Sequence, residues 1–337
     1  MLIDFLKGIK RVMQQNKPKP MLEYRNLSFV NWWKENPQED WFARFIHHHF
    51  SDYDKPIRFY SVFGPGRNLT DSFHGIKIFY SGENLAPHIE YSGMEKRKSV
   101  ETYWKYRTLC YGDCAIKQVD LSLGMTRNES ADNYLRFPEW IPFIFDPESS
   151  KEDIKDRVRE INDARANPNA RNAVLLASHD DYGTRERICR DVEKIIPITY
   201  AGKWRNNSTD LWEKYADNKR EYMKNFRFNI CPENVDAPGY CTEKIFEAFL
   251  SGTIPIYHGD RNNPEPGLIN RDTVIFWDYN GDNSEQLTKL NKLLTDEHYY
   301  EEFMQQPKLT DETVEFVYNK MQELKKRIAE LIDFRED

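Results

Sequence analysis

The sequence has few cysteines, and they form no recognisable framework. The five cysteines are an odd set without a Cys-x-x-Cys pair, at Cys110, Cys114, Cys189, Cys231 and Cys241. Disulfide-rich secreted domains and structural zinc sites both depend on paired or regularly spaced cysteines. The pattern therefore indicates neither a disulfide scaffold nor a zinc site, and it fits a reducing compartment.

The sequence also lacks a long apolar run. No segment approaches the roughly 18 consecutive apolar residues of a membrane-spanning helix. Residues 1–20 lack the apolar centre and the small-residue cleavage site of a signal peptide. We therefore expect a soluble, cytoplasmic protein.

Residues 2–12 combine apolar residues with Lys7, Lys10 and Arg11, which predicts a basic amphipathic helix. Two interpretations of this helix are open. It could pack on the body of the protein, or it could lie on an anionic membrane as a peripheral contact.

An excess of positive charge is missing. The chain has 48 Lys and Arg against 55 Asp and Glu, so its formal net charge is −7. This removes the general electrostatic argument for nucleic-acid binding, whereas a local basic patch could still hold a phosphorylated small molecule. The run His47-His48-His49 cannot by itself direct three side chains at one ion, so we expect no metal site.

The length and the apolar runs predict two α/β domains. A chain of 337 residues exceeds an ordinary single core, and its 39% hydrophobic content suffices for two. Short apolar runs alternate with longer amphipathic segments, which is typical of parallel sheets covered by helices. The predicted strands are residues 57–63, 77–80, 173–177, 226–231, 253–257 and 273–277.

A charged stretch ending in Asn167-Pro168-Asn169 predicts the junction between the domains. We therefore predict one domain over residues 1–165 and a second over residues 166–310. Residues 311–332 carry apolar side chains at helical spacing, so we expect residues 311–337 to form a helix that packs on the body.

One segment, residues 226–260, carries the strongest signal. It is predicted to form strand, polar loop, helix and strand, with the loop at the carboxyl end of a strand, where open α/β sheets bind ligands. Thr242, Glu243 and Lys244 open the helix, where unpaired amides and the helix dipole favour an anion such as pyrophosphate. On the residues alone, an ordinary first turn with a solvated lysine is an equal alternative.

The same segment closely resembles the donor-binding signature of the family 10 α1,3/4-fucosyltransferases. That signature pairs Glu-Asn with Tyr-x-Thr-Glu-Lys and a following strand containing Pro-Ile or Pro-Val. The matching residues are Glu233, Asn234, Tyr240, Thr242, Glu243, Lys244, Pro255 and Gly259. The chain departs from the family at Pro232, where an aromatic residue is usual, and at Cys241, where an apolar residue is frequent.

Three further patches are similar to the family in the same order. Residues 57–65 and 79–84 resemble bacterial members, whose acceptor domain ends a strand on Gly-Glu-Asn, so Glu83 is the candidate catalytic base. Residues 134–138 resemble the family's Tyr-Leu-Arg-x-Pro turn. Arg185 matches the family's phosphate-binding arginine in its spacing from an Ala-Ser pair. Without the resemblance, each patch would be interpreted as ordinary turn or surface residues.

The resemblance implies a GT-B architecture, in which two Rossmann-like domains face a cleft. Acceptor recognition would be N-terminal and nucleotide binding C-terminal. The implied reaction is inverting transfer of L-fucose from GDP-β-L-fucose to a GlcNAc-containing acceptor such as N-acetyllactosamine, in α1,3 linkage. Neither a divalent metal nor another cofactor would be required.

The resemblance also implies roles for individual residues. Glu83 would take the proton of the attacking hydroxyl, and Glu243 would face the fucose ring. Arg185 and Lys244 would neutralise the departing pyrophosphate. The expected donor-binding set is Arg185, Asn234, Tyr240, Thr242, Glu243 and Lys244. Within this set, Asn234 and Tyr240 would hold ribose or sugar hydroxyls.

Two other functions fit the sequence. One is a GT-B transferase that uses another nucleotide sugar, because fold and pyrophosphate contacts do not specify the base or the sugar. The other is a glycan-binding protein without turnover. Acceptor contacts are expected in residues 67–74 and 89–104, where the resemblance fades. The sequence leaves the acceptor, the linkage and the oligomeric state open, and we expect a bacterial cytoplasmic enzyme, peripheral on the inner membrane if the N-terminal helix binds lipid.

Overall fold

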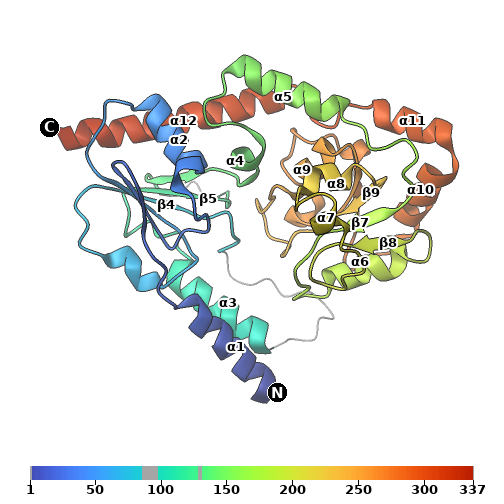
Figure 1. The fold of residues 1–337 in the computed structure, drawn as a ribbon, viewed down its shortest axis with the longest axis horizontal. Helices are drawn as coiled ribbons and strands as arrows, with labels where there is room; N and C mark the ends of the chain where they lie inside the picture. The colour runs from blue at the N-terminus through green and yellow to red at the C-terminus, as the bar shows by residue number, and fades with distance from the viewer. Residues whose placement is uncertain (1, 86–97, 128–130, 337) are drawn as a thin grey trace. The chain divides into compact units, whose positions relative to one another are not determined.

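A computed structural model describes residues 2–85, 98–127 and 131–336 of the chain. These residues form two compact α/β units (Figure 1). Unit 1 comprises Met1–Ser150 and Val317–Asp337, and unit 2 comprises Lys151–Phe316. Each unit has its own sheet, so the predicted α/β class with parallel sheets is confirmed.

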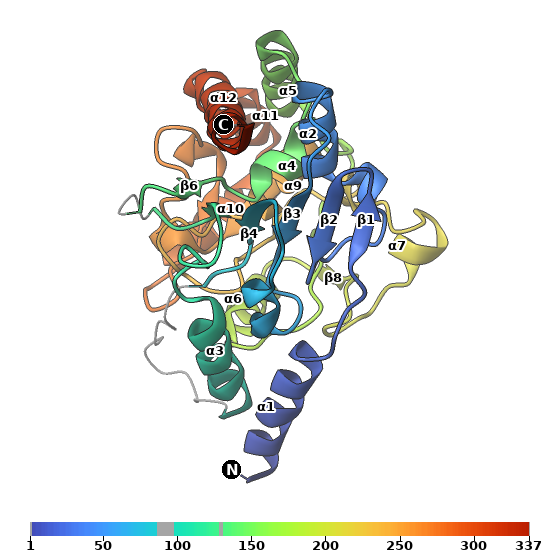
Figure 2. The same ribbon diagram turned by 90° about the vertical axis from the view of Figure 1, so that its left-hand side faces the viewer.

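The part of unit 1 that the structure describes contains a six-stranded sheet in the order β1-β2-β3-β4-β5-β6. Its strands are β1 (Leu22–Tyr24), β2 (Leu27–Val30), β3 (Ile57–Tyr60), β4 (Ile76–Tyr80), β5 (Leu121–Gly124) and β6 (Tyr134–Arg136). The β1–β2 pair is antiparallel and the other pairs are parallel. Figure 2 shows the first four strands side by side. The loops that follow the parallel strands therefore share one edge of the sheet.

Alternate strand residues of unit 1 cover opposite faces of the sheet. Phe59 packs against Phe42 of α2 (Trp41–His49), with ring centroids 5.5 Å apart. The next residue, Tyr60, belongs to a core cluster with Tyr111 of α3 (Lys98–Tyr111). The other helices of this unit are α1 (Leu2–Gln15), η1 (Pro37–Glu39), η2 (Gly66–Thr70) and α4 (Trp140–Ile144). The sheet is thus buried on both faces, as its continuous apolar strands require.

The part of unit 2 that the structure describes contains a five-stranded parallel sheet in the order β11-β10-β9-β7-β8. Its strands are β7 (Ala173–Leu175), β8 (Ile198–Tyr200), β9 (Phe228–Ile230), β10 (Ile254–Tyr257) and β11 (Ile275–Phe276). Strand β9 is central, with β7 and β10 on either side. The carboxyl ends of these three strands therefore lie next to one another.

Helices cover both faces of the unit 2 sheet. Ala173 and Leu175 share a core cluster with α6 (Thr184–Val192), α10 (Ser284–Thr295) and α11 (Glu297–Gln305). Val174, between them, belongs instead to the cluster with α7 (Asp210–Glu213) and α8 (Lys219–Met223). The remaining elements are α5 (Lys151–Asp163), α9 (Lys244–Leu250), η3 (Asp260–Asn262) and η4 (Arg271–Thr273). This alternation gives the doubly covered parallel sheet of a Rossmann-like unit.

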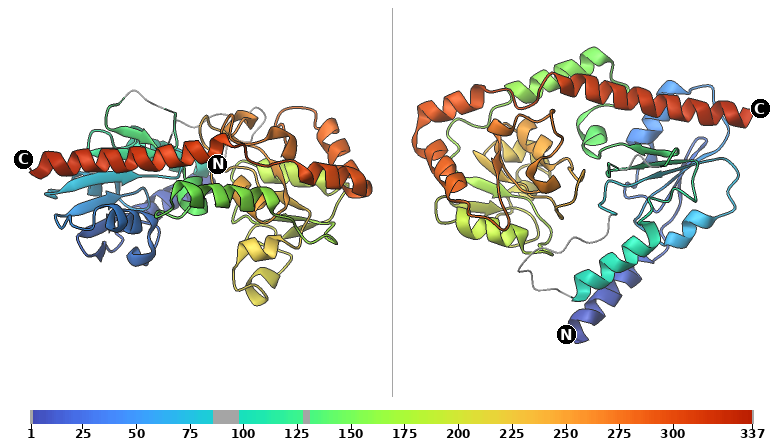
Figure 3. Two further views of the ribbon diagram at one scale, coloured as in Figure 1. Left: turned by 90° about the horizontal axis from the view of Figure 1, so that it is seen from above. Right: turned by 180° about the vertical axis from the view of Figure 1, so that it is seen from behind.

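The last helix, α12 (Glu312–Glu336), is continuous (Figure 3). Its first turn belongs to unit 2, and from Val317 onward it belongs to unit 1. The helix predicted over residues 311–337 is therefore present. The compact units, however, divide at other positions than the predicted domains. The predicted junction at 165/166 falls inside unit 2, because α5 buries Ile154, Val158 and Ile161 and packs against α9.

All six predicted strands are confirmed as β3, β4, β7, β9, β10 and β11. One prediction is wrong: residues 134–138 do not begin as a turn, since Tyr134–Arg136 pairs with β5 as a strand. The short strands β1, β2, β5, β6 and β8 were not predicted. Three or four residues carry too little periodicity to distinguish a strand from a loop.

Candidate functional site

The predicted ligand loop lies at the carboxyl edge of the unit 2 sheet. It runs from Cys231 to Glu243, between the end of central strand β9 and the start of α9. Two neighbouring loops make hydrogen bonds to this ligand loop. The amide of Glu233 donates to the carbonyl of His258 in the loop after β10, at 2.8 Å. Arg185, beyond the loop after β7, donates to Asn234.

The carboxylate of Glu233 organises this loop. One of its oxygens, Oε1, accepts from the amide of Thr242 at 2.8 Å and from the hydroxyl of Tyr257 at 3.2 Å. The other, Oε2, accepts from the hydroxyl of Thr242 at 2.8 Å and from Nζ of Lys244 at 3.1 Å. We call these four residues the Glu233 cluster. The Glu233 side chain is fully buried, and a buried carboxylate is tolerated only with such partners.

Two neighbours of Glu233 fit this arrangement. Burial raises the pKa of Tyr257, which keeps its hydroxyl protonated as a donor to the carboxylate. Gly259 lies so close that a Cβ built on it would be 2.6 Å from Cγ of Glu233. Only glycine therefore allows the loop after β10 to approach the buried carboxylate.

Arg185 lies in the first turn of α6 and is buried. Its Nη2 donates to Oδ1 of Asn234 at 2.7 Å, and its Nη1 donates to the carbonyl of His179 at 2.6 Å. Burial lowers the pKa of this guanidinium, and the charges of Asp180 and Glu233 oppose that shift. The group remains cationic at any physiological pH. Arg185 and Lys244 are thus attached to adjacent residues of one loop.

Asp180 holds the start of α6 in place. Its carboxylate accepts from the amides of Arg185 at 3.3 Å and of Glu186 at 2.9 Å, as a capping residue does. Gly183 adopts the left-handed conformation (φ 73°) immediately before the helix. The position of the Arg185 side chain therefore depends on a locally built turn.

The remaining predicted donor-site residues lie in the same loop. Tyr240 is buried. Glu243 is the N-cap residue of α9, and its Oε1 lies 3.9 Å from Nζ of Lys244. The expectation of unpaired amides at this helix start is wrong for Thr242, because its amide donates to Glu233. Positive charge here comes from side chains rather than from that amide.

The loop after β10 carries left-handed backbone at residues other than glycine. Asp260, Arg261, Asn262 and Glu265 have φ values of 44°, 48°, 56° and 42°. The carboxylate of Asp260 accepts from the amide of Gly239 in the ligand loop at 2.5 Å. Left-handed non-glycine residues cost conformational energy and concentrate at functional sites. Their presence supports the carboxyl edge as the site in unit 2.

Glu83, the predicted base, lies in unit 1, in the loop that follows β4. Its amide donates to the hydroxyl of Ser81 at 3.1 Å. Its Oε2 lies 3.5 Å from Nη1 of Arg107, a buried residue of α3. The guanidinium of Arg107 lies over the ring of Trp104, 5.3 Å from its centroid. The structure therefore gives Glu83 a cationic partner held in place by aromatic packing.

The two predicted acceptor loops are described in part. Residues 67–74 begin in η2, and Asp71 accepts from Nη1 of Arg58 at 2.8 Å and from the hydroxyl of Tyr60 at 2.7 Å. Of residues 89–104, positions 89–97 lie outside the described residues. Residues 98–104 form the first half of α3. This half contains Trp104, whose ring lies under the guanidinium of Arg107 on the same helix.

Sequence reasoning missed two residues of these sites. Glu233 was recognised as part of a motif, but its role as the common partner of the Glu233 cluster was not. Arg107 belongs to no sequence motif, so the sequence does not single it out. A buried arginine and a buried glutamate give no periodic signal, and their partners are distant in sequence.

No group of three or more His, Cys, Asp or Glu side chains within residues 2–85, 98–127 and 131–336 is arranged to hold a metal ion. All five cysteines lie in these ranges and are free. The predicted independence from metals and cofactors stays a prediction.

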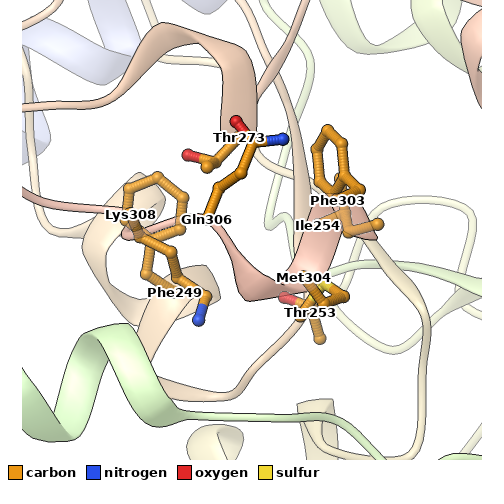
Figure 4. A pocket seen from close by; sticks show the side chains of 8 residues that line it. All are labelled: Phe249, Thr253, Ile254, Thr273, Phe303, Met304, Gln306 and Lys308. Carbon is orange, nitrogen blue, oxygen red and sulfur yellow. The ribbon is translucent and has the colours of Figure 1, made fainter. Parts of the chain in front are cut away.

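A small cavity in unit 2 lies at the opposite end of β10 from the ligand loop (Figure 4). Its lining is mainly apolar and comprises Phe249, Thr253, Ile254, Thr273, Phe303, Met304, Gln306 and Lys308. Nζ of Lys308 donates to the last carbonyls of α5, so this lysine serves as a helix cap. The cavity is a packing feature of the core rather than part of the site.

Comparison with known proteins agrees with the predicted family along most of the chain. The family model for the N-terminal domain of α-(1,3)-fucosyltransferase FucT matches residues 27–143. The model for the C-terminal part of glycosyltransferase family 10 (fucosyltransferase) matches residues 167–330. The second match contains every predicted donor-site residue, and the first contains Glu83.

Two curated proteins are similar in sequence. The α-(1,3)-fucosyltransferase FucT of Helicobacter pylori is 24% identical over 264 residues, which are 73% of this chain and 52% of that protein. The α-(1,3)-fucosyltransferase B of Drosophila melanogaster is 26% identical over 148 residues, which are 41% of this chain and 33% of that protein. The chain thus spans about half the length of the curated relatives it matches, or less.

The fold is similar to that of a solved enzyme. A crystal structure of an α1,3-fucosyltransferase with GDP-fucose matches with a TM-score of 0.54 and 17% identity, over 95% of this chain and 97% of that chain. This likeness confirms the GT-B type of fold. The matches in sequence and in fold lead to one conclusion: the chain belongs to glycosyltransferase family 10, the fucosyltransferases.

Proposed function

We propose that this chain transfers L-fucose from GDP-β-L-fucose to a GlcNAc-containing acceptor such as N-acetyllactosamine, with inversion and in α1,3 linkage. Family membership supports fucosyl transfer as the reaction. The GDP-fucose named with the similar crystal structure supports the donor. The observation that carries the proposal is the attachment of Arg185 and Lys244 to adjacent residues, Asn234 and Glu233, at the carboxyl edge of a parallel sheet.

The two cations suit a pyrophosphate. Charge builds on the leaving group as the bond to fucose breaks, and fixed positive charges stabilise it without needing to reorganise. Lys244 is held by the buried carboxylate of Glu233, and Arg185 by Asn234 and the His179 carbonyl. Because both side chains are already positioned, little rotamer entropy is lost when the donor binds. This arrangement supplies the charge that a metal ion supplies in other glycosyltransferases.

In the proposed transfer, Glu83 accepts the proton of the acceptor hydroxyl. The hydroxyl oxygen forms a bond to the anomeric carbon, and the bond from that carbon to the β-phosphate oxygen breaks. The electron pair of the broken bond leaves with GDP, so no covalent enzyme intermediate forms. In this proposal Arg107, whose Nη1 lies 3.5 Å from Oε2 of Glu83, holds the carboxylate in position.

The remaining residues act on the sugar and the ribose in this proposal. Glu243 stabilises positive charge on the fucose ring as the bond to GDP stretches. Asn234 and Tyr240 hold ribose or fucose hydroxyls. Thr242 contributes by fixing Lys244, to whose Nζ its hydroxyl oxygen lies at 2.7 Å.

The test begins with the nucleotide. GDP is expected to raise the melting temperature of the full chain, whereas UDP and CMP at the same concentration are expected to leave it unchanged. GDP-fucose with N-acetyllactosamine is then expected to give a fucosylated product, whose linkage is read by NMR or by permethylation analysis. Stabilisation by UDP or CMP in place of GDP, or glycan binding without any product, would reject the proposal.

A further inference from the structure

Helix α1 packs on α3 through its small and polar residues. A Cβ added to Gly8 would lie 2.8 Å from both Cα of Ser99 and Cβ of Thr102, so the two backbones are in close contact. The carboxylate of Asp4 accepts from the amide of Ser99 at 3.2 Å and from its hydroxyl at 2.8 Å. Figures 2 and 3 show the two helices side by side at the N-terminal end of unit 1. Gly8 and Asp4 thus mark the inner face of α1.

The apolar residues of α1 lie on its outer face. At 100° per residue, Leu2, Phe5, Leu6 and Met13 share one side of the helix, away from Asp4 and Gly8. The set of exposed large apolar residues on α1 is Leu2, Ile3, Phe5, Leu6 and Met13, each between 43% and 74% exposed. A surface helix normally turns such a face to the core. In α1 the apolar face is turned away from the protein instead, and no described part of the chain covers it.

Basic residues border the exposed apolar face. Residues 2–19 contain five basic residues and one acidic residue, although the chain as a whole has a net charge of −7. The acidic residue is Asp4, which is bonded to Ser99. Lys7 and Lys10 are exposed on α1. An apolar stripe with lysines along one edge complements the surface of a bilayer that contains anionic lipids.

We infer that α1 lies flat on a membrane surface rich in anionic lipid, with its apolar face among the acyl chains and its lysines at the lipid phosphates. No helix of the described residues is both long and apolar enough to cross a bilayer, so the contact would be peripheral. A second copy of this chain is a poorer occupant of the same face. Symmetric pairing would bring the lysines of both copies together, and like charges repel.

Vesicle flotation of the full chain tests this inference. The chain is expected to float with phosphatidylcholine vesicles that contain phosphatidylglycerol and not with pure phosphatidylcholine, and added salt is expected to weaken binding. Lys7→Gln with Lys10→Gln should weaken binding roughly thirty-fold, because each basic residue near an anionic surface contributes about 1 kcal/mol to binding. Leu6→Glu with Met13→Glu should weaken it about a hundred-fold or more, because apolar burial is lost.

A control is Trp212→Glu, which places one negative charge at an exposed aromatic residue of unit 2 and is expected to leave flotation unchanged. Circular dichroism and melting temperature check that each variant is folded. Fucosyl transfer to a soluble acceptor, measured on the same variants, should stay within about twofold of wild type. Failure of the membrane contact is therefore distinguishable from failure of the proposed activity.

Equal flotation with neutral vesicles, or unchanged flotation of the Leu6/Met13 variant, overturns the inference. Light scattering that shows a dimer lost on Leu6→Glu with Met13→Glu, without flotation of wild type, would also overturn it in favour of self-association.

Discussion

Lys244 donates from Nζ to Oε2 of Glu233 at 3.1 Å, and the two side chains of this pair differ sharply in exposure. The glutamate side chain is fully buried, whereas 24% of the lysine side chain is exposed. The pair therefore presents its cation, and not its carboxylate, towards solvent. A site for a phosphate group needs this polarity.

Replacing Glu233 should destabilise unit 2. Glu233→Ala leaves Lys244 and Thr242 without their common acceptor, and each buried donor that loses its acceptor costs about 1–3 kcal/mol. Chemical denaturation should show this as a lower midpoint with an unchanged slope. Glu193→Ala is the control, since that carboxylate accepts from Tyr200 and Arg205 but is partly exposed, so its loss should cost about 1 kcal/mol or less. Equal losses in both variants would contradict the special position of Glu233.

Arg185→Ala and Lys244→Ala should each weaken GDP binding. A charge-assisted contact contributes about 1.5–3 kcal/mol, so the dissociation constant should rise roughly ten- to hundred-fold. Isothermal titration calorimetry with GDP measures this directly. Arg187→Ala is a matched control on the same helix, because that arginine lies over the ring of Tyr279 and bonds its carbonyl. If GDP binds both variants as it binds wild type, the assignment of the two cations to the pyrophosphate is wrong.

Glu83→Gln should separate binding from turnover. The amide keeps the shape of the side chain but cannot accept the acceptor proton, so transfer should fall by about a hundred-fold or more. GDP affinity should stay within about twofold, because Glu83 belongs to unit 1 and the predicted nucleotide contacts belong to unit 2. Glu23→Gln, at an exposed position of β1, is the control for an exchanged glutamate of the same unit. A Glu83→Gln enzyme with near-normal turnover removes Glu83 from the mechanism.

Acidification should weaken unit 1 through His49. Burial lowers the pKa of this imidazole to about 4, helped by the charges of Lys325 and His48, although Glu148 acts in the opposite sense. The unfolded chain takes up a proton near the ordinary value of about 6.5, and the folded chain does not until about 4. The free energy of unfolding should therefore fall as the pH falls through this interval. Melting curves across it should show a smaller fall for His49→Gln than for wild type, and parallel curves would contradict the assignment.

Much of unit 2 could be predicted because its signals are local. The strand at 226–231, the polar loop and the helix that ends at Ser251-Gly252 follow from apolar runs and turn residues within one segment. The contacts that make this segment a site are not local. The hydroxyl of Tyr257 reaches Glu233 from 24 positions away, and Arg185 reaches Asn234 from 49. The family resemblance identifies Arg185 and Asn234 as site residues, but only the folded structure shows which hydrogen bonds join them.

Helix α1 shows where periodicity stops being informative. Its spacing predicted an amphipathic helix, and Leu2–Gln15 is helical. The pattern could not say which face would meet the protein. Gly8 and Asp4 pack on α3, whereas the large apolar side chains of Leu6 and Met13 are exposed. The predicted division at 165/166 differs from the compact units for a related reason. The charged surface of α5 dominated its composition, while its few apolar residues assign it to unit 2.

The Glu233 cluster also has a consequence for how this sequence can vary. Thr242, Lys244 and Tyr257 share a single acceptor, so a change at one alters what a change at the next will cost. Tyr257→Phe should be costly alone and cheaper once Glu233 has been replaced. Effects at these four positions will be epistatic, and the loop can be redesigned only as a unit.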